Sequence, residues 1–143
     1  MLLLFIYLIY FDLLIINLFW FWIDLSGETE TEETLLLSTA ALANLTFSHA
    51  EAVPLMAKHN TAQVLVDATA ARKDLSVFIQ DQIATILANM AAVYSVRADL
   101  VTHGALLTLL TFLQLPCPSP LQRPAQLTAK ERVLKKSAIA ISR

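Results

Sequence analysis

A repeated Ala-Asn step constrains the fold of this chain more than any other feature. The step occurs at Asn44 in ALANLTF and at Asn89 in ILANMAA, 45 residues apart. Around the second copy, apolar residues recur at helical spacing from Ile83 through Leu87 to Tyr94, which places them on one stripe of an α-helix. A helical period of this length predicts a solenoid, in which each repeat packs against its neighbours.

The segments between the two copies repeat as well. Residues 54–68 (PLMAKHNTAQVLVDA) align with residues 98–112 (ADLVTHGALLTLLTF) at an offset of 44, and Leu109 lies at a repeated apolar position. The alignment places Asn60 over Gly104, the two residue types that most readily adopt a positive φ. Each unit is therefore predicted to contain a short helix, a tight turn, a second helix, a loop and a long third helix. Leu87 and Leu109, which lie on the apolar stripe and at repeated positions, are predicted core residues.

The N-terminal segment differs sharply in composition from the repeats. Residues 1–23 contain only Asp12 and Asn17 as strongly polar residues and are long enough to cross a bilayer. Residues 1–26 also lack Ala, Gly, Pro and Arg, the residues with G/C-rich codons. Three interpretations stay open: a membrane helix, a gene-model artefact such as a translated intron, and a buried solenoid helix. A cleaved signal peptide is disfavoured because a basic n-region and an A-x-A-like cleavage site are absent from this sequence.

The rest of the chain divides into a linker and a repeat domain. The acidic run at residues 27–33 (GETETEE) is predicted to be a solvated linker. The repeat domain is predicted to span residues 34–143, as about two repeats plus a partial third. Its first helix, from about Thr34, corresponds to a third helix without its two partners, and its last helix stops in mid-pattern. We therefore expect the domain to be incomplete at both ends.

The polar positions of the third helices predict a binding surface. In a solenoid these helices stack side by side, so their polar stripes join into one groove. Asn44 and Asn89 occupy the same position, the alignment continues to Arg143, and Gln82 and Thr85 lie on the same stripe as Asn89. An Asn side chain both donates and accepts, which suits it to hold the backbone of an extended peptide. The alternative is that the asparagines make caps or local helix-exit hydrogen bonds.

The chemical inventory favours neither an enzyme nor a metal or cofactor site. Cys117 is the only cysteine and lies between prolines, without a partner for a disulfide or a Cys-x-x-Cys site. The histidines lack metal-ligand spacing: His49, His59 and His103. The aspartates are scattered over loops and helix starts rather than paired for acid–base chemistry: Asp67, Asp74, Asp81 and Asp99. We expect a non-enzymatic protein with no cofactor and no metal.

The charge distribution argues against nucleic-acid binding. The net charge is −2, which gives no general attraction to phosphate. The last helix is nevertheless locally basic, with Arg123, Lys130, Arg132, Lys135, Lys136 and Arg143. Two interpretations of these residues are open: a solvated helix face, or a docking patch for an acidic peptide.

The three long-helix segments together resemble a known family. A period in the forties with three helices per unit is the armadillo pattern, and the HEAT pattern shares the period with two helices. ETLLLSTAALANLTF, RKDLSVFIQDQIATILANM and KERVLKKSAIAISR, in this order, resemble the C-terminal armadillo-like domain of inscuteable-type adaptor proteins over residues 33–143. The family's N-terminal segment that binds a tetratricopeptide-repeat partner has no counterpart here, and several C-terminal repeats are absent.

The resemblance implies an all-α, armadillo/HEAT-like right-handed solenoid. It also implies a non-enzymatic adaptor in asymmetric cell division, with cortical polarity and spindle-orientation proteins as partners, and a peptide-binding role for Asn44 and Asn89. We accordingly expect protein or peptide partners, no nucleic acid, and a cytoplasmic location that includes the cell cortex. The alternative is a single-pass protein of unknown partner, anchored in a membrane through residues 1–23.

Overall fold

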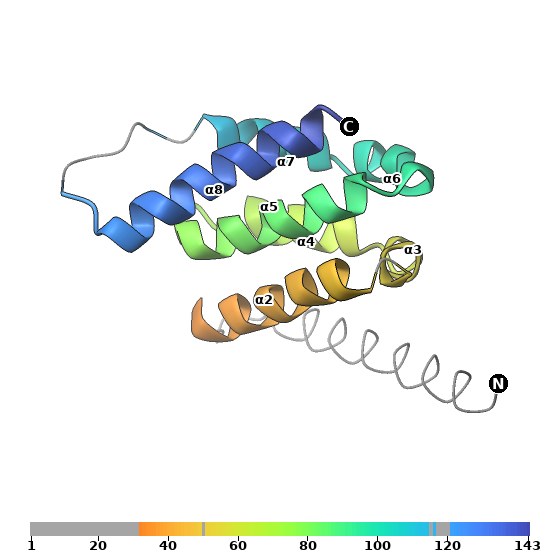
Figure 1. The fold of residues 1–143 in the computed structure, drawn as a ribbon, viewed down its shortest axis with the longest axis horizontal. Helices are drawn as coiled ribbons and strands as arrows, with labels where there is room; N and C mark the ends of the chain where they lie inside the picture. The colour runs from red at the N-terminus through yellow and green to blue at the C-terminus, as the bar shows by residue number, and fades with distance from the viewer. Residues whose placement is uncertain (1–31, 50, 115, 117–120) are drawn as a thin grey trace.

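The computed structural model describes residues 32–49, 51–114, 116 and 121–143 of the chain, and within these ranges its regular structure is entirely helical (Figure 1). The prediction of an all-α protein is confirmed for this part. The hydrophobic segment 1–26, the start of the predicted linker and Cys117 lie outside the described residues. The elements are α2 (Glu32–Ser48), α3 (Ala52–Lys58), α4 (Thr61–Ala70), α5 (Val77–Ala91), the 3₁₀ helix η1 (Tyr94–Val96), α6 (Arg97–Thr102), α7 (Ala105–Leu113) and α8 (Pro124–Ile141).

The helices recur in the predicted order of short, second and long. Helices α3, α4 and α5 form the first set, and α6, α7 and α8 form the second. Asn60, with φ 56°, precedes α4, and Gly104, with φ 79°, precedes α7. Both predicted turn residues are therefore confirmed in the left-handed region. A Cβ added at Gly104 would lie 3.8 Å from Cγ1 of Val66, so the backbone angle rather than lack of space favours glycine there.

Helix α5 is the centre of the molecule. It packs against α2 on one side and α8 on the other, and the three long helices run side by side in the same direction (Figure 1). Helices α4 and α7 lie behind them, and α3 and α6 lie at one end. Ser76 starts α5 as its N-cap, where its hydroxyl oxygen accepts a hydrogen bond from the Phe78 backbone N–H at 3.2 Å. Because α5 has neighbours on both sides, most of its residues are buried.

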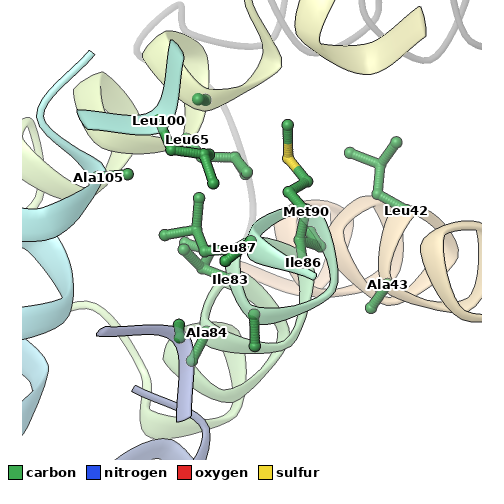
Figure 2. Packing of buried hydrophobic residues seen from close by; sticks show 14 of the residues in the cluster. Leu42, Ala43, Leu65, Ile83, Ala84, Ile86, Leu87, Met90, Leu100 and Ala105 are labelled. Atoms are coloured by element: carbon green, nitrogen blue, oxygen red, sulfur yellow. The ribbon is translucent and has the colours of Figure 1, made fainter. Parts of the chain in front are cut away.

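The hydrophobic core joins all of these helices. Leu87 and Leu109 are both buried, which confirms the two core residues predicted from the repeat. Figure 2 shows Ile83 and Leu87 of α5 projecting into a space shared with Leu65 of α4 and Leu100 of α6. Burying a side chain of this size stabilises the fold by roughly 1.5–3 kcal/mol relative to leaving it exposed.

The end of α5 differs from the prediction. The apolar spacing predicts a helix that continues to Tyr94, but α5 ends at Ala91 and the Tyr94 side chain is exposed. The reason is a local cap: Arg97 Nε donates to the Ala91 backbone oxygen at 2.8 Å, and the Arg97 guanidinium lies 5.4 Å from the centroid of the Tyr94 ring. The chain therefore turns into η1 and α6 instead of continuing along the α5 axis.

The start of α2 is close to the predicted one. Helix α2 includes Glu32 and Glu33, two residues before the expected start at Thr34, because carboxylates favour the positive N-terminal end of a helix.

In the described part of the chain, no single helix combines the length and the apolar character needed to span a bilayer. Helix α5 passes that test only together with residues 94–102, across a bend of 110°.

Candidate interaction surface

One side of α2, α5 and α8 carries side chains from all three long helices, and we call it the third-helix face. Along each helix most of its members are separated by three, four or seven residues, the spacings that place them on one side of an α-helix. Its members are Leu37, Asn44 and Phe47 on α2; Gln82, Thr85 and Asn89 on α5; and Arg132, Lys135, Lys136 and Ile139 on α8, with Arg143 just beyond its end. The five residues of the predicted groove are among these members, and their joining into one groove stays a prediction.

The junction between α5 and α8 is an ionic cluster centred on Asp81. The Asp81 side chain is 4% exposed; its Oδ2 accepts from Arg132 Nε at 2.9 Å and its Oδ1 accepts from Lys136 Nζ at 2.9 Å. Lys136 Nζ also donates to the hydroxyl of Thr85, which itself donates to the Asp81 backbone oxygen at 2.6 Å. One carboxylate faces two cations, so the cluster keeps a net positive charge. The Arg132 side chain remains 48% exposed and the Lys136 side chain 29% exposed.

The junction between α2 and α5 is made by Asn89. Its Nδ2 donates to Thr46 Oγ1 at 3.0 Å, and Thr46 Oγ1 in turn donates to the Ala43 backbone oxygen at 2.8 Å. This bond holds the side chain of Asn89 in one orientation. It uses one of the two amide hydrogens, which leaves the other hydrogen and the carbonyl oxygen able to bind a peptide backbone. Asn89 therefore has the geometry for a structural role and for a binding role.

The α2 edge of the face exposes two large apolar side chains, and the exposed Glu33 precedes Leu37 by four residues on the same helix. Asn44 is exposed on α2, between two large exposed hydrophobic side chains of the same helix. These are Phe47, which is 84% exposed, and Leu37, which is 71% exposed. Exposed side chains of this size around an exposed amide can contact a partner at little desolvation cost.

Arg143 lies beside the last turn of α5. Its Nη1 donates to the Ala88 backbone oxygen at 2.9 Å, which brings its guanidinium next to the Asn89 step. The sequence alignment places Arg143 one repeat after Asn89, and in the structure Arg143, just beyond the end of α8, contacts α5, which carries Asn89. Because a guanidinium carries five N–H donors, most of them remain available to a ligand.

Sequence reasoning missed the ionic cluster. It grouped Asp81 with aspartates of loops and helix starts, whereas Asp81 lies inside α5 and is buried against α8. The available signal was the spacing of Asp81 from Thr85, four residues apart on one stripe, opposite a last helix rich in cations. Lys130, counted among the basic residues of that helix, is buried and does not belong to the exposed face.

An apolar pocket of about 250 Å³ lies where α5, α6, α7 and α8 meet. Leu87 and Leu109 of the core contribute to its wall, and the guanidinium-bearing residues Arg97 and Arg143 line it as well. Among the described residues, no group of three or more His, Cys, Asp or Glu could hold a metal ion.

Comparisons with known proteins agree with one another. The family described as "Protein inscuteable C-terminal" matches residues 15–143. The chain is 31% identical over 122 residues to the human protein inscuteable homolog, and 32% identical over 122 residues to the mouse protein inscuteable homolog. Each alignment covers 85% of this chain and 21% of the relative, so the chain spans about a fifth of the length of these relatives. None of the solved structures matches it.

Proposed function

Because this chain belongs to the inscuteable C-terminal family, we propose that it is a non-enzymatic protein-interaction module that serves as an adaptor in asymmetric cell division. The observation that carries the proposal is the third-helix face, on which three parallel helices present amides, hydroxyls and cations beside exposed apolar side chains. Such a mixture suits the recognition of another protein better than the chemistry of a reaction.

We propose that the fold that carries this face is an armadillo-type right-handed solenoid. Two observations support it: the order of short, second and long helices occurs twice, and left-handed turn residues occupy the same place in both sets. The long helices α2, α5 and α8 take the part of third helices, so the described residues correspond to two repeats preceded by one more third helix. In this arrangement stacked third helices form a continuous binding surface.

The binding residues in the proposal are those of the predicted groove: Asn44, Gln82, Thr85, Asn89 and Arg143. Asn44 and Asn89 lie at equivalent positions of α2 and α5, and Arg143 lies next to α5 from the end of α8. An extended peptide that crosses the three helices would meet an amide at two of them and a guanidinium at the third. Amides bind the peptide backbone, so affinity would not depend on the peptide's side chains at those two points.

The proposed partners are cortical polarity and spindle-orientation proteins, and the proposed location is the cytoplasm at the cell cortex. Both follow from family membership and concern a protein several times longer than this chain. A membrane anchor in residues 1–23 is the alternative location, and those residues lie outside the described part.

The test is a paired substitution on the face. Asn44→Ala together with Asn89→Ala, in the full chain fused to a fluorescent protein, is expected to reduce cortical enrichment in dividing polarised cells by about tenfold or more, equivalent to about 1.4 kcal/mol of binding. The matched control is Gln63→Ala with Gln114→Ala, which removes two amides from α4 and from the end of α7.

Thermal unfolding of the same purified variants separates binding from structure. Loss of the hydrogen bond from Asn89 to Thr46 is expected to cost only about 0.5–1.5 kcal/mol, so the doubly substituted chain stays folded. Unchanged cortical enrichment together with a lowered melting temperature would show that the asparagines are structural. Equal losses in the control pair would show that the effect is not specific to the face.

A further inference from the structure

The third-helix face changes in chemical character from one edge to the other. Its α8 edge carries four cations: Arg132, Lys135, Lys136 and Arg143. Asp81 neutralises only one of the two charges that it contacts, and because it is buried it is not available to a cation from outside. The α2 edge instead exposes Leu37 and Phe47. A ligand that covers the whole face must therefore be anionic at one end and apolar at the other.

The distance between the two edges fixes the spacing of these features in the ligand. Packed helices lie roughly 8–10 Å apart, so the axes of α2 and α8 are separated by roughly 16–20 Å, with α5 between them. An extended chain advances about 3.3 Å per residue and covers that distance in about five or six residues. Asn89 and Thr85 lie midway, where they can bind the peptide backbone.

We propose that the third-helix face binds an extended acidic peptide whose carboxylates lie on α8 and whose bulky apolar side chain, about five or six residues away, packs on Leu37 and Phe47. This inference rests on the proposed function and specifies the class of peptide that the groove takes. It also selects between the two interpretations of the basic last helix, in favour of docking.

Charge complementarity and the neighbouring groups favour carboxylates on a peptide. The ionic cluster holds Arg132 and Lys136 in fixed orientations, which lowers the entropy that they lose on binding a carboxylate. Arginine forks also bind carboxylates in bidentate geometry. A nucleic-acid duplex presents phosphates along its whole length and offers no bulky apolar group to Leu37 and Phe47.

Fluorescence anisotropy of the full chain tests the inference with a defined probe. The probe is a labelled peptide that carries a run of Glu and one Phe about six residues away. Two control peptides are compared with it: the Gln peptide, in which every Glu is replaced by Gln, and a peptide in which the Phe is replaced by Ala. We expect the Glu peptide to bind at least about tenfold more tightly than the Gln peptide, with the difference shrinking as salt is added, and the Phe-to-Ala change to weaken binding severalfold.

Charge reversal on the chain provides the matched test. Lys135→Glu with Arg143→Glu is expected to abolish the preference for the Glu peptide. The control Lys58→Glu with Lys73→Glu makes the same change of net charge at exposed sites on α3 and in the loop after α4, and it is expected to retain the preference. If Lys135→Glu with Arg143→Glu lowers the melting temperature, the milder variant Lys135→Gln with Arg143→Gln is measured instead. We then expect the preference for the Glu peptide over the Gln peptide to decrease, but not to change into a preference for the Gln peptide.

Three results would overturn the inference. The first is equal affinity for the Glu and Gln peptides, with the binding of both weakened by Asn44→Ala plus Asn89→Ala. This result would support the proposed peptide groove but reject the proposal that the groove prefers acidic peptides. Absence of binding to either peptide would reject an acidic peptide as the ligand, while the cortical-enrichment assay still decides the proposed function. Sedimentation with phosphatidylserine vesicles that depends on Lys135 and Arg143, without discrimination between the peptides, would assign the cations to a membrane surface.

Discussion

Replacing Asp81 by Asn is expected to weaken the attachment of α8 to α5. The substitution keeps the size of the side chain and one acceptor oxygen but removes the negative charge. Two cations, Arg132 and Lys136, then face each other across a buried amide whose NH₂ group cannot accept from either. Among the described residues, no other carboxylate pairs with Arg132 or Lys136.

The magnitude follows from the burial of each partner. A hydrogen bond to a charged group contributes about 1.5–3 kcal/mol when it is shielded from water. The bond from Lys136, whose side chain is 29% exposed, counts near the lower end of that range. The bond from Arg132, with a side chain 48% exposed, is screened and counts as roughly 0–1 kcal/mol. The expected loss is therefore about 2 kcal/mol, below the roughly 3–5 kcal/mol typical of breaking a fully buried ion pair.

Urea unfolding of the full chain, followed by far-UV circular dichroism, measures this loss. The midpoint should fall while the slope with urea stays the same, because the surface exposed on unfolding does not change. A double-mutant cycle of Asp81→Asn with Lys136→Met should give a coupling energy of at least about 1 kcal/mol. Asp67→Asn, at an exposed site on α4, is the control and should cost less than about 0.5 kcal/mol.

Two outcomes would refute this reasoning. A loss for Asp81→Asn no larger than that of the Asp67→Asn control would mean that the carboxylate does not stabilise the junction. A coupling energy near zero would mean that Asp81 acts through something other than its ion pair with Lys136.

The remaining predictions concern the core, a turn and the N-terminal segment. Leu87→Ala should lower the free energy of unfolding in urea by about 2–5 kcal/mol, because Leu87 is buried beside a pocket that its truncation would enlarge. The control Leu107→Ala, at an exposed site, should cost less than about 0.5 kcal/mol. Similar losses for the two variants would show that the core is assigned wrongly. Gly104→Ala should lower stability by about 1–2 kcal/mol through its positive φ alone, since the added Cβ only contacts Val66 at 3.8 Å, and a neutral result would contradict the left-handed turn. Residues 1–23, if translated in the cell, should keep the chain in carbonate-washed membranes, and release into the soluble fraction would reject the membrane-anchored alternative.

Local signals in the sequence were enough to predict the helical framework. The recurrence of Asn44 at Asn89 and the helical spacing of the apolar residues identified the long helices, because helix periodicity is written in consecutive residues. Asn60 and Gly104 marked the turns because few other residues adopt a positive φ without strain. Leu87 and Leu109 could be assigned to the core because each lies on the apolar side of its own helix.

The contacts between helices were decided only by the tertiary structure. Asp81 finds Arg132 and Lys136 at separations of 51 and 55 residues, and Asn89 finds Thr46 at a separation of 43. Which side chains meet across such distances depends on how far each helix is displaced and rotated along its neighbour, and the spacing within one helix does not specify that. A carboxylate at the same position of an isolated α5 would be solvated; packing of α8 against it buries the charge and supplies the cations that make the burial tolerable.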